Sequence, residues 1–242
     1  MNLRPLLSLR LRRTHSPRAV ASSRRAFLRL ATVVGALVLA TTLTASVAFA
    51  QTLGRATSDF PNLRPNKTET AFGRLAADAL RAAGKADVAL INAGALRPGT
   101  LESGAIERND LVNLLAFGED KVVSVVLTGA QLRAALERAA SVYPTASPAF
   151  LQVAGISATI NPDAAVGSRV SRINVGGRAL DDAKTYRAAM PVSLAQGAAG
   201  YFNIWNGAQS SPTDVQLIDA LGGYIRGQKE VAPETQTRFG PA

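Results

Sequence analysis

The sequence of 242 residues contains no cysteine and a single histidine, His15. The absence of cysteine excludes disulfides and thiolate chemistry, although such a chain would tolerate an oxidising compartment. Zinc, copper and most two-metal hydrolase sites use imidazole or thiolate ligands, and Ser-His-Asp and Cys-His sites need an imidazole base. Because His15 lies in a segment that we interpret below as a signal, residues 51–242 contain neither histidine nor cysteine, and none of these sites can be built from them. They leave carboxylate chemistry, a cation site made of oxygens, or binding without catalysis.

Several short enzyme motifs are absent as well. The sequence has no D-x-D-x-D-G calcium loop, no G-x-x-x-x-G-K-[ST] phosphate loop and no G-x-S-x-G nucleophile turn. It also has no internal repeat and no low-complexity tract. The motifs therefore give no direct support to an enzyme that works alone.

The first 50 residues show the features of a twin-arginine export signal in their usual order. S-R-R-A-F-L-R at residues 23–29 contains the paired arginines, an apolar run starts at Leu30, and A-F-A at residues 48–50 forms a small-x-small cleavage site. We therefore predict a cleaved signal and a periplasmic or secreted protein. The alternative is an uncleaved membrane anchor, because roughly 20 apolar residues are enough to span a bilayer.

The net charge of +10 comes mostly from this segment. Residues 1–50 hold eight arginines and no acidic residue, which leaves 19 basic and 17 acidic side chains in residues 51–242. A mature chain so close to neutral gives no reason to expect nucleic acid as a partner, and it would meet a membrane only through an uncleaved signal. The remaining 192 residues are enough for one domain with a sizeable core.

Hydrophobic patterning divides the mature chain into a lead-in, one domain and a tail. Residues 51–66 are polar and turn-rich, residues 67–230 carry helix and strand patterns, and residues 231–242 are polar and expected to be loose. The fold class that these patterns predict is α+β, with helices packed on a mixed or antiparallel sheet.

Helix patterns occur in four places. Apolar residues recur at helical spacing from Thr68 to Ala83, with Glu69 in the first turn. A short helix is predicted at residues 107–115, and a capping box of Thr128 and Gln131 starts the next helix, which ends near residue 143. A last helix is expected to start at Ser211-Pro212, because proline suits a first helical turn.

Strand patterns occupy most of the rest. Residues 88–91 form a short apolar run typical of a strand buried on both faces. Residues 121–127 are rich in β-branched side chains. Four further short strands, separated by turn signals, predict an antiparallel meander: 150–153, 157–160, 169–175 and 186–190.

Four residues stand out as candidates for binding. Asn92 and Arg97 follow the buried strand 88–91, where α/β proteins often place ligands, and an arginine fork suits phosphate or carboxylate. Phe117 lies beside a glycine in a polar loop and predicts either a lid on the core or a stacking platform. Tyr201 follows two glycines that permit positive φ, which predicts either a loop-tip ring or a ring packed on the core with its hydroxyl at the surface.

The order and spacing of these segments resemble one known family. The matching stretches are E-T-A-F-G-R-L (69–75), V-A-L-I-N-A-G-A-L-R (88–97), F-G (117–118), L-T-G-A-Q-L (127–132), F-L-Q-V-A-G (150–155) and G-Y (200–201). Together they resemble the C-terminal, substrate-recognition domain of the 5′-nucleotidase family. The resemblance covers about residues 64 to 226.

The resemblance implies binding of a nucleoside or nucleotide without catalysis in this chain. It implies that Asn92 and Arg97 contact the polar part of the ligand and that Phe117 and Tyr201 sandwich the base. In that family an N-terminal metallophosphoesterase domain holds two metals, and we expect it to be absent here. No cofactor is therefore expected in this chain, and a two-metal site would have to come from a partner protein.

Some positions depart from the family pattern and suggest altered ligand specificity. The family usually has N-G-G-G-I-R where this chain has N-A-G-A-L-R at residues 92–97, and G-G-D-G where it has G-A-A-G at 197–200. An arginine common in the family is replaced by Asn66. Two alternatives to a binding module stay open: the substrate-binding half of a split hydrolase, and a relic scaffold for protein contacts with both aromatic rings buried.

Overall fold

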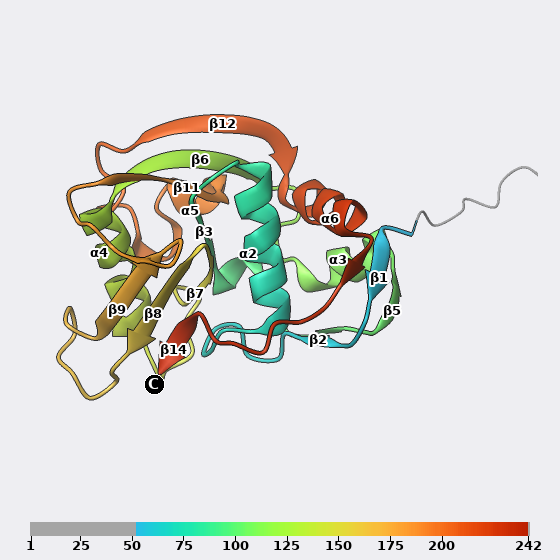
Figure 1. Cartoon of the computed structure of the whole chain (residues 1–242), viewed down its shortest axis with the longest axis horizontal. Coiled ribbons are helices and arrows are strands. Elements are labelled where there is room, and N and C mark those ends of the chain that lie inside the picture. The colour runs from blue at the N-terminus through green and yellow to red at the C-terminus, as the bar shows by residue number, and fades with distance from the viewer. Residues whose placement is uncertain (1–51, 242) are drawn as a thin grey trace, which may run out of the picture. The chain divides into compact units, whose positions relative to one another are not determined.

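A five-stranded mixed sheet lies at the centre of the computed structural model, which describes residues 52–241 (Figure 1). Its strand order is β12-β6-β11-β3-β7. Strand β3 (Val88–Asn92) is buried along its whole length, as predicted. It runs parallel to β11 (Thr185–Pro191) and antiparallel to β7 (Leu151–Ala154). The predicted signal lies outside the described residues.

The far edge of this sheet corrects one predicted boundary. Strand β6 (Lys121–Thr128) pairs with β11 and with β12 (Gln209–Gln216), so Pro212 lies in a strand, and helix α6 starts only at Leu217. An edge strand tolerates proline because one row of its N–H groups needs no partner in the sheet. The same residue type suits a first helical turn, and this ambiguity explains the wrong prediction.

Helices cover both faces of the sheet (Figure 1). Helix α2 (Ala71–Ala83) and helix α6 (Leu217–Gln228) pack together on one face, and α4 (Gly129–Ser141) lies on the other. The capping box before α4 is present as predicted: Gln131 N–H donates to the hydroxyl of Thr128, and the Gln131 amide oxygen accepts from Thr128 N–H. Alternate residues of β3 therefore belong to two separate cores.

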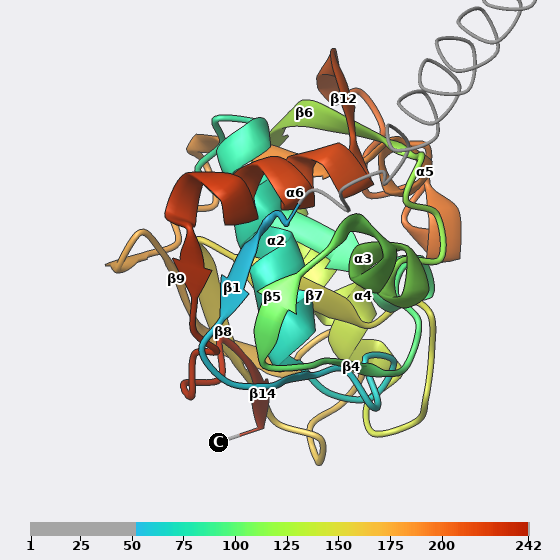
Figure 2. The ribbon, with the colours of Figure 1, turned by 90° about the vertical axis from the view of Figure 1, so that its right-hand side faces the viewer.

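Shorter elements surround these layers. Figure 2 shows α6 lying across α2 with β1 and α3 beside them. The remaining helical segments are η2 (Ala93–Ala95), α3 (Arg108–Leu114), α5 (Val192–Ala195) and η3 (Ala198–Gly200). The remaining strands are β1 (Gly54–Ala56), β2 (Phe60–Pro61), β4 (Thr100–Leu101), β5 (Gly104–Ile106), β8 (Ile156–Ile160), β9 (Val170–Val175), β10 (Arg178–Ala179), β13 (Glu230–Val231) and β14 (Phe239–Pro241).

The predicted meander is only partly correct. Strands β8, β9 and β10 are antiparallel neighbours in one sheet, but β7 and β11 belong to the central sheet. Each of those two strands pairs with β3; β7 is buried along its whole length, and β11 is buried from Ala188 to Pro191. Short strands with turn signals look alike in either arrangement, because the pairing partner is not encoded locally.

The C-terminal segment is not a loose tail, so the predicted end of the domain at residue 230 is wrong. Strand β13 pairs with β1, and β14 pairs with β8. The Phe239 ring is fully buried and stacks on Phe150 at 5.5 Å between centroids. Arg238 forms a salt bridge of 2.8 Å with Asp78 of α2. The lead-in likewise contributes β1 and β2 to the domain.

Glu69 lies two residues before the start of the helix in which it was predicted. Helix α2 starts at Ala71 with Thr70 as its N-cap, and the Glu69 carboxylate is buried beneath the C-terminal segment. It accepts hydrogen bonds from Arg74 at 3.3 Å and from the backbone N–H of Arg238 at 2.7 Å. Burial raises the pKa of Glu69 above its ordinary value, although both arginines oppose the shift.

In residues 52–241 no helix is long and apolar enough to cross a bilayer.

Candidate functional site

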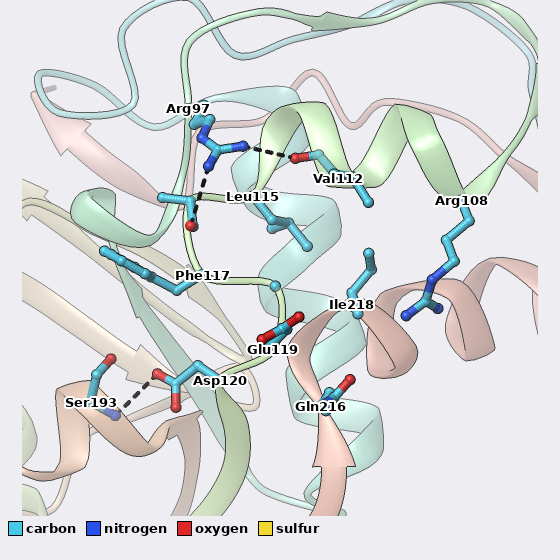
Figure 3. Close-up of a pocket in the computed structure, with 12 residues that line it drawn as sticks. Arg97, Arg108, Val112, Leu115, Phe117, Glu119, Asp120, Ser193, Gln216 and Ile218 are labelled. Carbon is cyan, nitrogen blue, oxygen red and sulfur yellow. Dashed lines mark hydrogen bonds between the residues drawn. The ribbon is translucent and has the colours of Figure 1, made fainter.

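A cavity of about 750 Å³ opens beside the loop that follows α3 (Figure 3). Its walls come from α3, from residues 115–120, from Ser193 of α5 and from Gln216 and Ile218 at the start of α6. The lining is mixed: it contains apolar side chains, arginines and carboxylates. Three of these wall segments lie next to strands of the central sheet: residues 115–120 precede β6, Ser193 follows β11, and Gln216 ends β12. The sheet therefore brings together segments that are distant in sequence.

Phe117 is the most prominent apolar side chain of this cavity, with 62% of its surface exposed. It does not form a lid on the core, which was one of its two predicted roles. Its loop is fixed by backbone hydrogen bonds: Leu217 N–H donates to Asp120 at 2.7 Å, and Ile218 N–H donates to Gly118 at 2.9 Å. These donors are the first N–H groups of α6, which have no partner within the helix.

Arg97 also lines the cavity, but part of its guanidinium is already engaged. It donates to the carbonyl of Val112 at 3.0 Å and to that of Ala116 at 3.4 Å (Figure 3). These contacts hold the side chain against the end of α3 and the start of the loop. An arginine has five donors, so a ligand can still be bound by those that remain.

Asn92 does not line this cavity, although it was predicted to bind the ligand with Arg97. Its side chain is buried and its Nδ2 donates to the carbonyl of Pro148 at 3.3 Å. Its Oδ1 is buried and has no hydrogen-bond partner within residues 52–241. Between Asn92 and Arg97 the chain forms η2, and this turn separates the two side chains.

Tyr201 is fully buried and does not line the cavity either, so the predicted sandwich with Phe117 is wrong. Its ring is fully buried and stacks on Trp205 at 5.5 Å between centroids. Its hydroxyl donates to the carbonyl of Ala149 at 2.6 Å, and burial raises the pKa of this hydroxyl. Gly197 and Gly200 do have positive φ, but they turn the tyrosine inward. The predicted alternative was right about the ring and wrong about the hydroxyl, which is not at the surface.

The relic-scaffold hypothesis predicted a filled pocket with both rings buried. Only Tyr201 meets that description, because the cavity is open and Phe117 is exposed. Sequence reasoning also missed several lining residues, namely Arg108, Glu119, Asp120, Ser193 and Gln216. Only Glu119 and Asp120 carried a local signal, since they directly follow Phe117 and Gly118.

Asp120 has a defined position in the wall of the cavity. One carboxylate oxygen, Oδ2, accepts the backbone N–H of Ser193 at 3.1 Å. Its own N–H donates to Phe117 at 3.0 Å, which closes a tight turn over residues 117–120. Within residues 52–241 neither Asp120 nor Glu119 forms a salt bridge, so this wall carries negative charge.

The described residues do not fit a two-metal centre. No group of three or more histidine, cysteine, aspartate or glutamate side chains comes together in residues 52–241. A hydrolytic site of the imidazole-rich type therefore has no set of ligands within these residues.

Comparison with known proteins identifies similar chains. Residues 46–206 match the family described as 5′-nucleotidase, C-terminal domain. A 5′-nucleotidase-related protein of Glossina morsitans morsitans is 31% identical over 209 residues, which cover 77% of this chain and 37% of that protein. A 5′-nucleotidase of Vibrio cholerae is 30% identical over 174 residues, which cover 72% of this chain and 30% of that protein.

A solved structure is similar in fold as well. The crystal structure of a 5′-nucleotidase precursor from Thermus thermophilus superposes with a TM-score of 0.75 at 25% identity, covering 84% of this chain and 42% of that one. The match confirms the predicted fold, in which helices pack on a mixed sheet. The chain spans less than half the length of each of these relatives.

Proposed function

Because the chain belongs to the 5′-nucleotidase C-terminal domain family, we propose that it binds a nucleoside or nucleotide in the cavity at Phe117. The base stacks on one face of the Phe117 ring, and the sugar or phosphate lies toward Arg97. The nucleotidase names of the relatives support this class of ligand. The observation that carries the proposal is the exposed Phe117 ring, held on an anchored loop beside a cavity of about 750 Å³.

The chemistry of the cavity suits such a ligand. Stacking of one base on an aromatic ring contributes about 1–3 kcal/mol. An arginine supplies charge-assisted hydrogen bonds to a phosphate or a sugar hydroxyl. Among the described residues of the lining, Phe117 is the only aromatic side chain, so the base has a platform on one side and not a sandwich.

Calorimetric titration tests the proposal with adenosine, AMP and a UDP-sugar at high protein concentration. We expect Phe117→Ala to weaken binding by about 5- to 150-fold, the equivalent of the stacking free energy. Phe202→Ala is the matched control, because Phe202 is 70% exposed and lies outside the cavity lining. The absence of heat from all three ligands would contradict the proposal.

Arg97 is tested by comparing AMP with adenosine. We expect Arg97→Ala to weaken AMP more than adenosine, because only AMP presents a phosphate to the guanidinium. The ratio of the two affinities separates this effect from any loosening of the loop, which would weaken both ligands alike. Arg178→Ala, an exposed arginine on β10, serves as the control for removal of one positive charge.

Hydrolysis is proposed to depend on a metallophosphoesterase domain or a separate protein, as in a split enzyme. The exposed Val112 and Phe117 at the cavity favour this second role, since a partner could cover them. We expect the purified chain with excess manganese or zinc to leave AMP intact, and phosphatase activity to rise on mixing with the partner. Turnover by the isolated chain, retained after removal of contaminants, would refute the need for such a partner.

Export is proposed from the twin-arginine pattern alone. We expect a mature N-terminus after Ala50 in the periplasmic or secreted fraction. The double substitution Arg24→Lys and Arg25→Lys should leave the protein uncleaved inside the cell. Secretion unaffected by these changes would argue against twin-arginine export.

A further inference from the structure

Charged side chains of both signs line the cavity: Arg97, Arg108, Glu119 and Asp120, of which Arg108 is already paired with Asp219. Figure 3 shows Arg97 at one end, Asp120 and Ser193 at the other, and Phe117 between them. Asp120 and Phe117 belong to the same tight turn, closed by the hydrogen bond from Asp120 N–H to Phe117. The turn therefore places the carboxylate in the same short loop as the ring on which a base would stack, and both residues line the cavity.

A hydrogen bond to the backbone orients the carboxylate of Asp120. Its Oδ2 accepts the N–H of Ser193, whereas Oδ1 has no hydrogen-bond partner within residues 52–241. A carboxylate is an acceptor only, and Glu119 adds a second negative charge to the same wall. This end of the cavity therefore favours ligand atoms that carry hydrogen and disfavours lone pairs.

We propose that Asp120 is a specificity-determining residue, which accepts a hydrogen bond from an N–H group on the edge of the base that stacks on Phe117. This inference rests on the proposed function of the cavity and extends it. It defines the ligand as a nucleoside whose base presents an N–H donor, with its sugar or phosphate toward Arg97. Adenosine meets this requirement through its amino group, while purine riboside has the same ring system and no base donor.

The test is calorimetric titration of the full chain with adenosine and purine riboside. We expect the wild-type protein to bind adenosine about tenfold more tightly, as for a hydrogen bond to a charged group. Asp120→Asn should abolish or reverse this preference. The Ser193 N–H needs an acceptor, so the amide oxygen stays on it and the amide nitrogen, a donor, faces the ligand.

Asp163→Asn provides the control for charge, because Asp163 is exposed and lies outside the cavity lining. It should leave the ratio of affinities unchanged. Equal affinities in the wild type, or a ratio unchanged by Asp120→Asn, would overturn the role of Asp120 and leave the proposed function standing. If neither nucleoside binds, both the role of Asp120 and the proposed function are overturned.

Discussion

Tyr201 provides a sharp test of the placement of the aromatic side chains. Its hydroxyl donates to the carbonyl of Ala149 at 2.6 Å inside the core. Tyr201→Phe keeps the ring but leaves that buried carbonyl without its partner, which costs about 1–3 kcal/mol. In urea denaturation this loss should lower the midpoint without changing the m-value. The affinity for adenosine should stay within about twofold, because Tyr201 does not line the cavity.

Alkaline pH gives the same substitution a second signature. Burial raises the pKa of Tyr201, so the unfolded chain loses this proton near pH 10 while the folded protein retains it. The free energy of unfolding of the wild type therefore falls as pH rises above about 10, and this contribution is absent in Tyr201→Phe. The two proteins should become closer in stability there.

The matched control is Tyr143→Phe, because the Tyr143 hydroxyl forms no hydrogen bond within residues 52–241. This change should alter the unfolding free energy by less than about 0.5 kcal/mol. If Tyr201→Phe unfolds at the wild-type urea midpoint, or weakens adenosine as Phe117→Ala is expected to do, the buried position of Tyr201 is refuted.

Two further predictions concern the C-terminal segment and its contact with α2. Phe239→Ala should lower the free energy of unfolding in urea by about 3–5 kcal/mol because its ring is fully buried, whereas Phe202→Ala should change it little. A small effect of Phe239→Ala would instead support the predicted loose tail. Burial raises the pKa of Glu69 above 4.5, so the folded protein holds this proton more tightly than the unfolded chain does. The protonated Glu69 therefore adds to the free energy of unfolding fully below pH 4.5, and this stabilisation is lost as pH rises through the pKa of the folded state. Relative to Glu69→Gln, the unfolding free energy of the wild type should therefore decline on raising pH from 4.5, and parallel pH profiles would contradict this.

Local signals account for what the sequence predicted correctly. The strand predicted at residues 88–91 and the capping box at Thr128 and Gln131 depend on neighbouring residues, and both are present, the strand extending to Asn92. The Arg238 contact was not predictable, because its partner Asp78 lies 160 positions away. Pro212 carried a local signal with two meanings, and the pairing of β12 with β6 decided between them.

In the candidate site, too, local sequence predicted some positions correctly, and tertiary contacts decided the others. Phe117 and Arg97, two of the four candidate residues, line the cavity, because each belongs to a short loop fixed at a strand or helix end. Tyr201 and Asn92 were misplaced because their direction depends on tertiary contacts, with Ala149 and Pro148 respectively. No sequence motif could have shown that the Tyr201 hydroxyl would donate to a buried carbonyl.

The loop at Phe117 also explains how an exposed ring can serve as a rigid platform. The first N–H groups of α6 lack partners in their own helix, and the carbonyls of Gly118 and Asp120 supply them. Capping of the helix and positioning of the ring therefore depend on the same hydrogen bonds. Gly118 has little room, because a Cβ at this position would lie 3.3 Å from the Cβ of Ile218. A larger side chain there would separate loop and helix, and so would loosen the platform together with the start of α6.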